Sequence, residues 1–349
     1  MSVLNSARPS ASPRPQRRIA RLAVLPILIA AVLATAQVPA ASAAPASAWE
    51  VSSTIAVGQA PNQFAVSPDA ARLYVTAGEG IDIIDTATNT VVARASTPAS
   101  VGGIAVSPSG EIYVVGSAGT AYVIDPQTYT VVDDIAVEPN SIGMTASGDA
   151  VYVTNPTSGT ISVIDTATNT VESTVPAGKN PVLATALDGT VYVSNAGSGT
   201  VSAIDSATDT VIATIPTGGV PVGITSTAGR VYAVEGISQS VAVIDASTNT
   251  VVDTIEVGGG TLTGIAVTPD GSTIFVNQSD TDTTVMIDTA DPSSRKTVTV
   301  GARPGGAIAA PDNVAAYVTN GEGASVSVLT TAAQPCTGFA CIPTGSFGG

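Results

Sequence analysis

Two sets of polar residues recur along the chain at a fixed interval, and they are its candidates for chemistry. The first is an aspartate that follows an isoleucine, at Ile84-Asp85 and then every 40 residues to Ile244-Asp245, with a sixth copy at Ile287-Asp288. Six carboxylates could suggest calcium, but each falls in a separate repeat. Because Asp readily bonds backbone N–H groups two residues on, we interpret these residues as turn formers. They are Asp85, Asp125, Asp165, Asp205, Asp245 and Asp288.

The second set is a position that is small in the first two repeats, Ala77 and Gly116, and polar in the next five. We expect it on one face of the fold, together with charged loop residues. Such a ring could bind a cation, a sugar or a peptide. The alternative is ordinary loop polarity, with Asn side chains capping nearby backbone groups. The candidate ligand-binding residues are Asn155, Asn195, Glu235, Gln278, Asn320, Glu79, Glu138, Lys179, Arg303 and Glu322.

Two further acids, Asp280 and Asp282, lie two residues apart in a small insertion of the sixth repeat. Alternate oxygens of this kind can chelate calcium, although neither the glycine nor the distal glutamate of an EF-hand is present. Calcium at this pair is therefore the one cofactor the sequence suggests, and we otherwise expect none. On the same face Lys179 and Arg303 could attract a carboxylate or phosphate, or could form local ion pairs.

Composition removes several function classes. The 349 residues contain no histidine, which excludes Ser-His-Asp and Cys-His nucleophiles and the commonest general base. Acids outnumber bases 27 to 12, and this net charge of −15 argues against binding to a nucleic acid backbone. Apolar residues make up 44% of the chain, which is enough to build a core.

The first 43 residues read as a signal peptide. Five arginines precede an apolar run at 22–36, and the small residues Ala41-Ser42-Ala43 follow it. The run is shorter than the roughly 20 residues that span a bilayer, so we expect cleavage after Ala43; the alternative is an uncleaved membrane anchor. Cleavage leaves a net charge of −20 and no second apolar span. We expect the product to be secreted or held at the cell envelope.

A repeat of about 40 residues organises the rest of the chain into seven units over residues 44–330. Each unit contains four short alternating segments separated by turn residues, for example 142–146, 151–155, 160–164 and 170–175 in the third. An antiparallel meander this small cannot bury both faces alone, whereas seven of them stacked around an axis can. The sequence therefore predicts an all-β, seven-bladed β-propeller of four-stranded antiparallel blades. An aromatic residue that recurs in every unit, such as Tyr152, is expected to pack between blades.

The two ends of the repeat region complement each other. Residues 49–57 read WEVSSTIAV and match the fourth strand of other units, whereas the seventh unit loses its pattern after its third strand. We expect the N-terminal strand to complete the last blade and close the ring, because an open ring would expose two blade faces and a strand edge.

These residues also carry a family resemblance. Residues 152–155 and 317–320 spell YVTN, and residues 158–171 read SGTISVIDTATNTV. The chain resembles YVTN-repeat β-propellers, the group that includes YncE-like exported proteins, over residues 50–330. The resemblance implies a propeller and export; members resemble propellers with varied roles, including cell-surface proteins, nucleic-acid binders and domains of redox enzymes.

We therefore expect a non-catalytic binding scaffold that engages a protein, glycan or small molecule on the loop face around the central channel. The alternative is a carboxylate-based enzyme, lactonase- or lyase-like, using acids such as Glu79, Glu235 or Glu322 on that face. The tail, 331–349, contains the only two cysteines, Cys336 and Cys341, which we expect to form a disulfide outside the cytoplasm. We expect a monomer.

Overall fold

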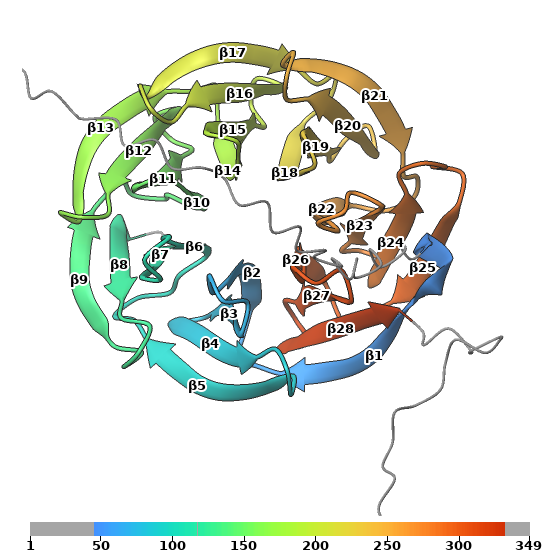
Figure 1. Ribbon diagram of the computed structural model, residues 1–349, viewed down its shortest axis with the longest axis horizontal. Helices are drawn as coiled ribbons and strands as arrows, with labels where there is room; N and C mark the ends of the chain where they lie inside the picture. Colours follow the sequence, from blue (N-terminus) through green and yellow to red (C-terminus); the bar gives the residue numbers. More distant parts are fainter. Residues whose placement is uncertain (1–44, 117, 332–349) are drawn as a thin grey trace, which may run out of the picture. The chain divides into compact units, whose positions relative to one another are not determined.

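A computed structural model describes residues 45–116 and 118–331. The predicted signal peptide and the cysteines Cys336 and Cys341 lie outside these residues. Seven four-stranded antiparallel sheets form a ring around a central axis, as the sequence predicts (Figure 1). Within the described residues, no helix is long and apolar enough to cross a membrane.

Each blade runs outward from strand a, which faces the axis, to strand d at the rim. A short 3-10 helix, η1 (Ala46–Ala48), precedes the first strand. The first three blades contain β2 (Pro61–Val66), β3 (Arg72–Ala77), β4 (Gly80–Asp85) and β5 (Thr90–Ser96); β6 (Gly103–Val106), β7 (Ile112–Gly116), β8 (Thr120–Ile124) and β9 (Val131–Ala136); and β10 (Met144–Ser147), β11 (Ala150–Asn155), β12 (Thr160–Asp165) and β13 (Thr170–Pro176). Blades 4 and 5 contain β14 (Pro181–Leu187), β15 (Thr190–Asn195), β16 (Thr200–Asp205) and β17 (Thr210–Pro216); and β18 (Pro221–Thr227), β19 (Arg230–Glu235), β20 (Ser240–Asp245) and β21 (Thr250–Glu256). Blades 6 and 7 contain β22 (Leu262–Val267), β23 (Thr273–Gln278), β24 (Thr283–Asp288) and β25 (Arg295–Thr299); and β26 (Pro304–Ala309), β27 (Ala315–Asn320), β28 (Ser325–Thr331) and β1 (Trp49–Ala56).

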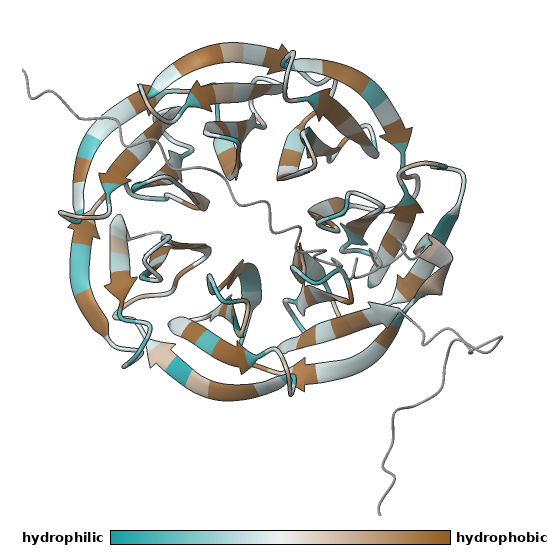
Figure 2. Cartoon of the chain, viewed as in Figure 1, coloured by the Kyte–Doolittle hydropathy of each residue, from teal (hydrophilic) through white to brown (hydrophobic). Residues whose placement is uncertain are grey.

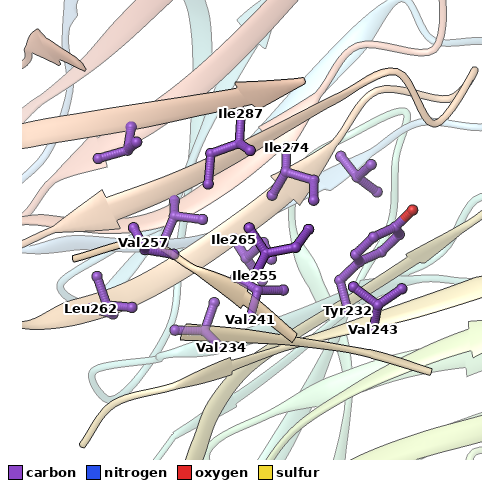
Figure 3. Close-up of a cluster of buried hydrophobic side chains, with 13 residues drawn as sticks. Tyr232, Val234, Val241, Val243, Ile255, Val257, Leu262, Ile265, Ile274 and Ile287 are labelled. Carbon is purple, nitrogen blue, oxygen red and sulfur yellow. The ribbon is translucent and has the colours of Figure 1, made fainter. Parts of the chain in front are cut away.

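The core lies between the faces of neighbouring blades. The strands b are the most buried, and β11 and β27 are buried at every position, because a blade covers each of their two faces. The cluster between blades 5 and 6 shows the packing: Val234 and Val241 of one blade meet Ile265 and Ile274 of the next (Figure 3). Hydrophobic residues follow the strands, and hydrophilic ones occupy many of the turns (Figure 2). Burying these faces is what makes seven marginal meanders one stable ring.

The repeated aspartates are turn residues, as expected. Oδ1 of Asp165 accepts the backbone N–H groups of Ala167 (2.9 Å) and Thr168 (2.7 Å) and also the hydroxyl of Thr168 (2.9 Å). The bond from the Thr168 hydroxyl, followed by the two backbone bonds, lowers the pKa of Asp165. The turn closes on Asn169, whose φ is 52°. Asn169 Oδ1 in turn accepts a hydrogen bond from the Tyr113 hydroxyl of blade 2 (2.7 Å).

This tyrosine bond joins neighbouring blades at several places. The hydroxyl of Tyr152 donates to Asp209 of blade 4 (2.9 Å), and the hydroxyl of Tyr192 donates to Asn249 of blade 5 (2.8 Å). The tyrosines are therefore inter-blade residues, as expected, but their hydroxyl groups contribute as well as their rings.

The N-terminal strand closes the ring. β1 pairs with β28 from Trp49–Thr331 to Ala56–Ser325, and it forms strand d of blade 7. Trp49 is buried and its ring meets Phe275 of blade 6 edge to face, with centroids 4.9 Å apart. The Tyr317 hydroxyl of blade 7 donates to Asn89 of blade 1 (3.0 Å), which repeats the inter-blade bond across the closure.

Candidate ligand-binding site

The loops that join strand b to c and strand d to the next strand a lie on one face, which we call the mouth face. The predicted ligand residues all lie in these loops or at the strand ends beside them. The structure does not bring them into one site, because the amides at the ends of strands b point into their own blades.

The amides of Asn155, Asn195 and Asn320 have no exposed surface. Asn195 is typical: its Nδ2 donates to Ser202 of strand c (2.9 Å), and its Oδ1 accepts the N–H of Gly178 in the preceding d–a loop (3.0 Å). Each amide thus fastens a d–a loop to strands b and c. The equivalent bonds join Asn320 to Ser327 and Gly301, and Asn155 to Ser162 and Ser141.

The residue before each amide joins two blades. Oγ1 of Thr154 accepts the N–H of Gly143 in its own blade (2.8 Å) and donates to the carbonyl of Val182 in the next (2.9 Å). Thr319 does the same across the ring closure, where it donates to Asn62 O (3.0 Å). In YVTN, therefore, the tyrosine and threonine join blades and the asparagine fastens a loop, so each polar residue of the motif has a structural role.

Blade 1 replaces the asparagine with a different arrangement. Ala77 stands at the position of the asparagine. Asp82 of strand c is buried, with 4% of its side-chain surface exposed, and its carboxylate therefore needs a partner. Arg94 of strand d supplies it: its guanidinium bonds Asp82 (3.0 Å) and the carbonyl of Ala77 (2.8 Å). The N–H of Gly58 in the d–a loop completes the set by donating to Asp82.

Gln278 of blade 6 keeps the fastening role. It is 6% exposed, and its Nε2 donates to the carbonyls of Gly258 (2.7 Å) and Gly259 in the d–a loop, while its Oε1 accepts the hydroxyl of Thr283 (3.0 Å).

Glu235 of blade 5 occupies the same position without these bonds. It is 1% exposed, and neither carboxylate oxygen has a hydrogen-bond partner among the described residues. The serine that Asn195 uses is replaced by Ala242, which offers no hydroxyl. Burial raises the pKa of Glu235, and the nearby hydroxyl of Thr217 offsets only part of this rise.

The charged candidates lie apart from one another on the mouth face. Glu79 and Lys179 are exposed, and Arg303 forms an exposed ion pair with Glu322 (2.9 Å). Glu138 is half-buried and accepts the hydroxyl of Thr160 (3.2 Å). Exposed pairs of this kind contribute little to stability, so these residues mainly set the charge of the face.

Asp280 and Asp282 bind backbone groups. Asp280 accepts the N–H of Thr261 (2.7 Å), and Asp282 accepts the N–H of Arg303 (2.8 Å). The two carboxylates therefore order separate d–a loops. Among residues 45–116 and 118–331, no group of three or more Asp, Glu, Cys or His side chains is placed to hold a metal ion.

A cavity of about 650 Å³ opens at the centre of the mouth face. It is formed where the strands a of all seven blades begin, and none of the described residues that line it is charged. Its walls are mainly aliphatic side chains and glycines, with a few amides and hydroxyls. The lining residues are Asn62, Gln63, Ser100, Val101, Gly102, Gly116, Ser141, Ile142, Val182, Leu183, Val222, Leu262, Thr263, Gly264, Gly305 and Gly306. Such a volume suits a small molecule.

No protein-family model and no curated protein matches the chain. Among solved structures, hydrazine synthase of Kuenenia stuttgartiensis superposes with a TM-score of 0.71 at 18% identity, over 78% of this chain and 96% of that one. The Cps50 (Swd1) β-propeller domain of Myceliophteria thermophila gives a TM-score of 0.70 at 11% identity, over 81% of this chain and all of that one. At these identities the likeness shows the fold alone: the chain is a seven-bladed β-propeller.

Proposed function

We propose that the chain is a non-catalytic binding scaffold whose ligand enters the cavity at the centre of the mouth face. The observation that carries this proposal is the cavity itself, which is about 650 Å³ in volume and is lined by residues from every blade. Concave openings lined by apolar side chains with a few polar groups are where proteins most often hold small molecules. No carboxylate from residues 45–116 or 118–331 lines it, so the cavity favours binding over the carboxylate-based enzyme.

We further propose that the protein acts outside the cytoplasm and is a divergent YVTN-repeat propeller. The leader-like pattern at 1–43 supports export. The structural roles of Tyr152, Thr154 and Asn155 support the family, since they explain why this combination of residues repeats. The mature net charge supports a partner other than a nucleic acid.

The test is a thermal-shift screen of residues 44–349 against neutral, acidic and basic small molecules, sugars and Ca²⁺. A ligand present at 100 times its dissociation constant stabilises by about 2.7 kcal/mol, which corresponds to a shift of several degrees. Val222→Phe narrows the cavity and should abolish the shift. Val92→Phe, the same change on the exposed rim, should leave it intact. A ligand that shifts the Val222→Phe variant as strongly as the wild type would refute the cavity as its site.

A further inference from the structure

The innermost ring of the propeller is built from glycines at one equivalent position of strand a. At five blades this residue packs against a carbonyl of the next blade so closely that an added Cβ would lie within 3 Å of the carbonyl oxygen. Glycine is required there because the strands converge on the axis. The five residues are Gly103, Gly143, Gly223, Gly264 and Gly306.

Blades 1 and 4 break this pattern with Gln63 and Leu183. Each occupies the glycine position, because its N–H donates to a strand-b hydroxyl, as the N–H of Gly143 does to Thr154. The acceptors are Thr76 for Gln63 (3.0 Å) and Ser194 for Leu183 (3.1 Å). Their strands, β2 and β14, lie on opposite sides of the axis (Figure 1). Both residues line the 650 Å³ cavity and a second cavity of about 130 Å³ that continues into the channel. They therefore form a waist between the two, polar on one side and apolar on the other.

The wall of the 650 Å³ cavity likewise has an apolar side and a polar side. Ile142, Val182, Val222 and Leu262, from blades 3 to 6, make one side aliphatic. The other side comes from blades 7, 1 and 2, where Gly305, Gly306 and Gly102 adjoin the amides of Asn62 and Gln63. Neither of these two amides makes a side-chain hydrogen bond within residues 45–116 and 118–331, so both can bond a ligand.

No charged residue lines either cavity among those described. A charged ligand would lose its hydration without gaining a partner, which is costly, whereas a neutral one would not. Taking the proposed binding site as given, we infer that it selects a neutral, mostly apolar small molecule with one hydrogen-bonding group. That group meets Asn62 and Gln63, the apolar body lies against the aliphatic side, and Gln63 and Leu183 limit how deeply it enters.

Two dyes with one ring system test the selection by charge. N-phenyl-1-naphthylamine is neutral with a single N–H, and 8-anilinonaphthalene-1-sulfonate adds a sulfonate to it. We expect the neutral dye to bind at least tenfold more tightly even in 500 mM NaCl, where repulsion of the sulfonate by the acidic protein is screened and the local desolvation penalty remains. Equal affinities, or an advantage that disappears in high salt, would overturn the inference and leave the binding site intact. If neither dye nor any member of the thermal-shift screen binds, the proposed function fails with it.

Two variants test the amide edge and the waist. Gln63→Leu should weaken the neutral dye about two- to tenfold, as the loss of one neutral hydrogen bond predicts, and Gln127→Leu on the exposed rim turn should not. When 1-alkanols displace the dye, the affinity of the alkanol should rise about fourfold per methylene and should stop rising beyond a fixed chain length. Leu183→Ala should move this limit to longer chains. Unchanged dye binding in Gln63→Leu, or an unchanged limit in Leu183→Ala, would contradict the assigned roles.

Discussion

Replacing the buried carboxyl of Glu235 should stabilise the propeller, and only at pH values at which that carboxyl would ionise. The side chain is 1% exposed and neither oxygen has a partner among the described residues, so the charged form is disfavoured and its pKa is raised. Between its unfolded and folded pKa values, the folded protein binds more protons than the unfolded chain. Stability therefore falls as pH rises through this interval and stays lower above it.

The magnitude follows from the missing bonds. An unsatisfied buried polar group costs about 1–3 kcal/mol, and 1 kcal/mol changes the melting temperature of a propeller this size by about 1.5–2 °C. Glu235→Gln should raise the melting temperature by about 2–5 °C at pH 7.5 and by little below pH 4. Adding Ala242→Ser to Glu235→Asn recreates the bonds of Asn195 and Ser202 and should add about 1 kcal/mol beyond the sum of the single changes.

The assay is differential scanning calorimetry from pH 4 to 8. Glu322→Gln, a carboxyl exposed on the same face, is the matched control and should show no such pH-dependent gain. A Glu235→Gln variant that is less stable than the wild type at pH 7.5, or that differs from it equally at every pH, would show that the carboxylate is favourably paired and would refute the reasoning.

Three other sites test polar bonds between blades and within them. Tyr317→Phe removes the hydroxyl bond to Asn89 across the closure and should lower the free energy of unfolding in urea by about 0.5–1.5 kcal/mol. An unchanged free energy would mean that only the aromatic ring of Tyr317, and not its hydroxyl, contributes there. Arg94→Ala leaves Asp82 buried without its ion pair and should cost about 3 kcal/mol, and the further change Asp82→Ser should recover much of it; equal stability of the single and double variants would contradict this. The lowered pKa of Asp165 stabilises above its unfolded pKa, and this contribution is lost as pH falls through the folded pKa. Asp165→Asn should therefore flatten part of the acid unfolding profile, and an unchanged profile would argue against the turn bonds.

The repeat was enough to predict the blades, the closing strand and the aspartate turns, because each depends on local pattern and on its recurrence. The alternation of polar and apolar residues could not predict where the side chain of Asn155 points. Every residue of β11 is buried, so the pattern does not distinguish a side chain that faces its own blade from one that faces a ligand. One signal was present in the sequence. Asn at the end of strand b occurs with a serine seven residues later in blades 3, 4 and 7, and both are absent together in the other four. That pairing indicates a contact within a blade and not a shared ligand.

The sequence predicts that a ligand binds around the central channel, but it does not predict which residues line the cavity. Its lining comes from one short segment of each repeat, and such segments as 141–142 and 182–183 have no distinctive composition. Gln63 and Leu183 stand out only when the seven strands a are compared. The other five blades have glycine at this position because the next blade approaches it closely. Which side of the cavity each residue faces depends on the order of blades around the axis.

The pairing of β1 with β28 has a mechanical consequence. Trp49 and Thr331 are partners at the same end of an antiparallel ladder, so the two ends of the ring leave it side by side. A force that pulls them apart loads the ladder one hydrogen-bonded pair at a time, like a zipper, and never shears the whole strand at once. The strand that completes the ring at equilibrium should therefore also be the first to yield under tension, while the six blades built from continuous chain remain folded.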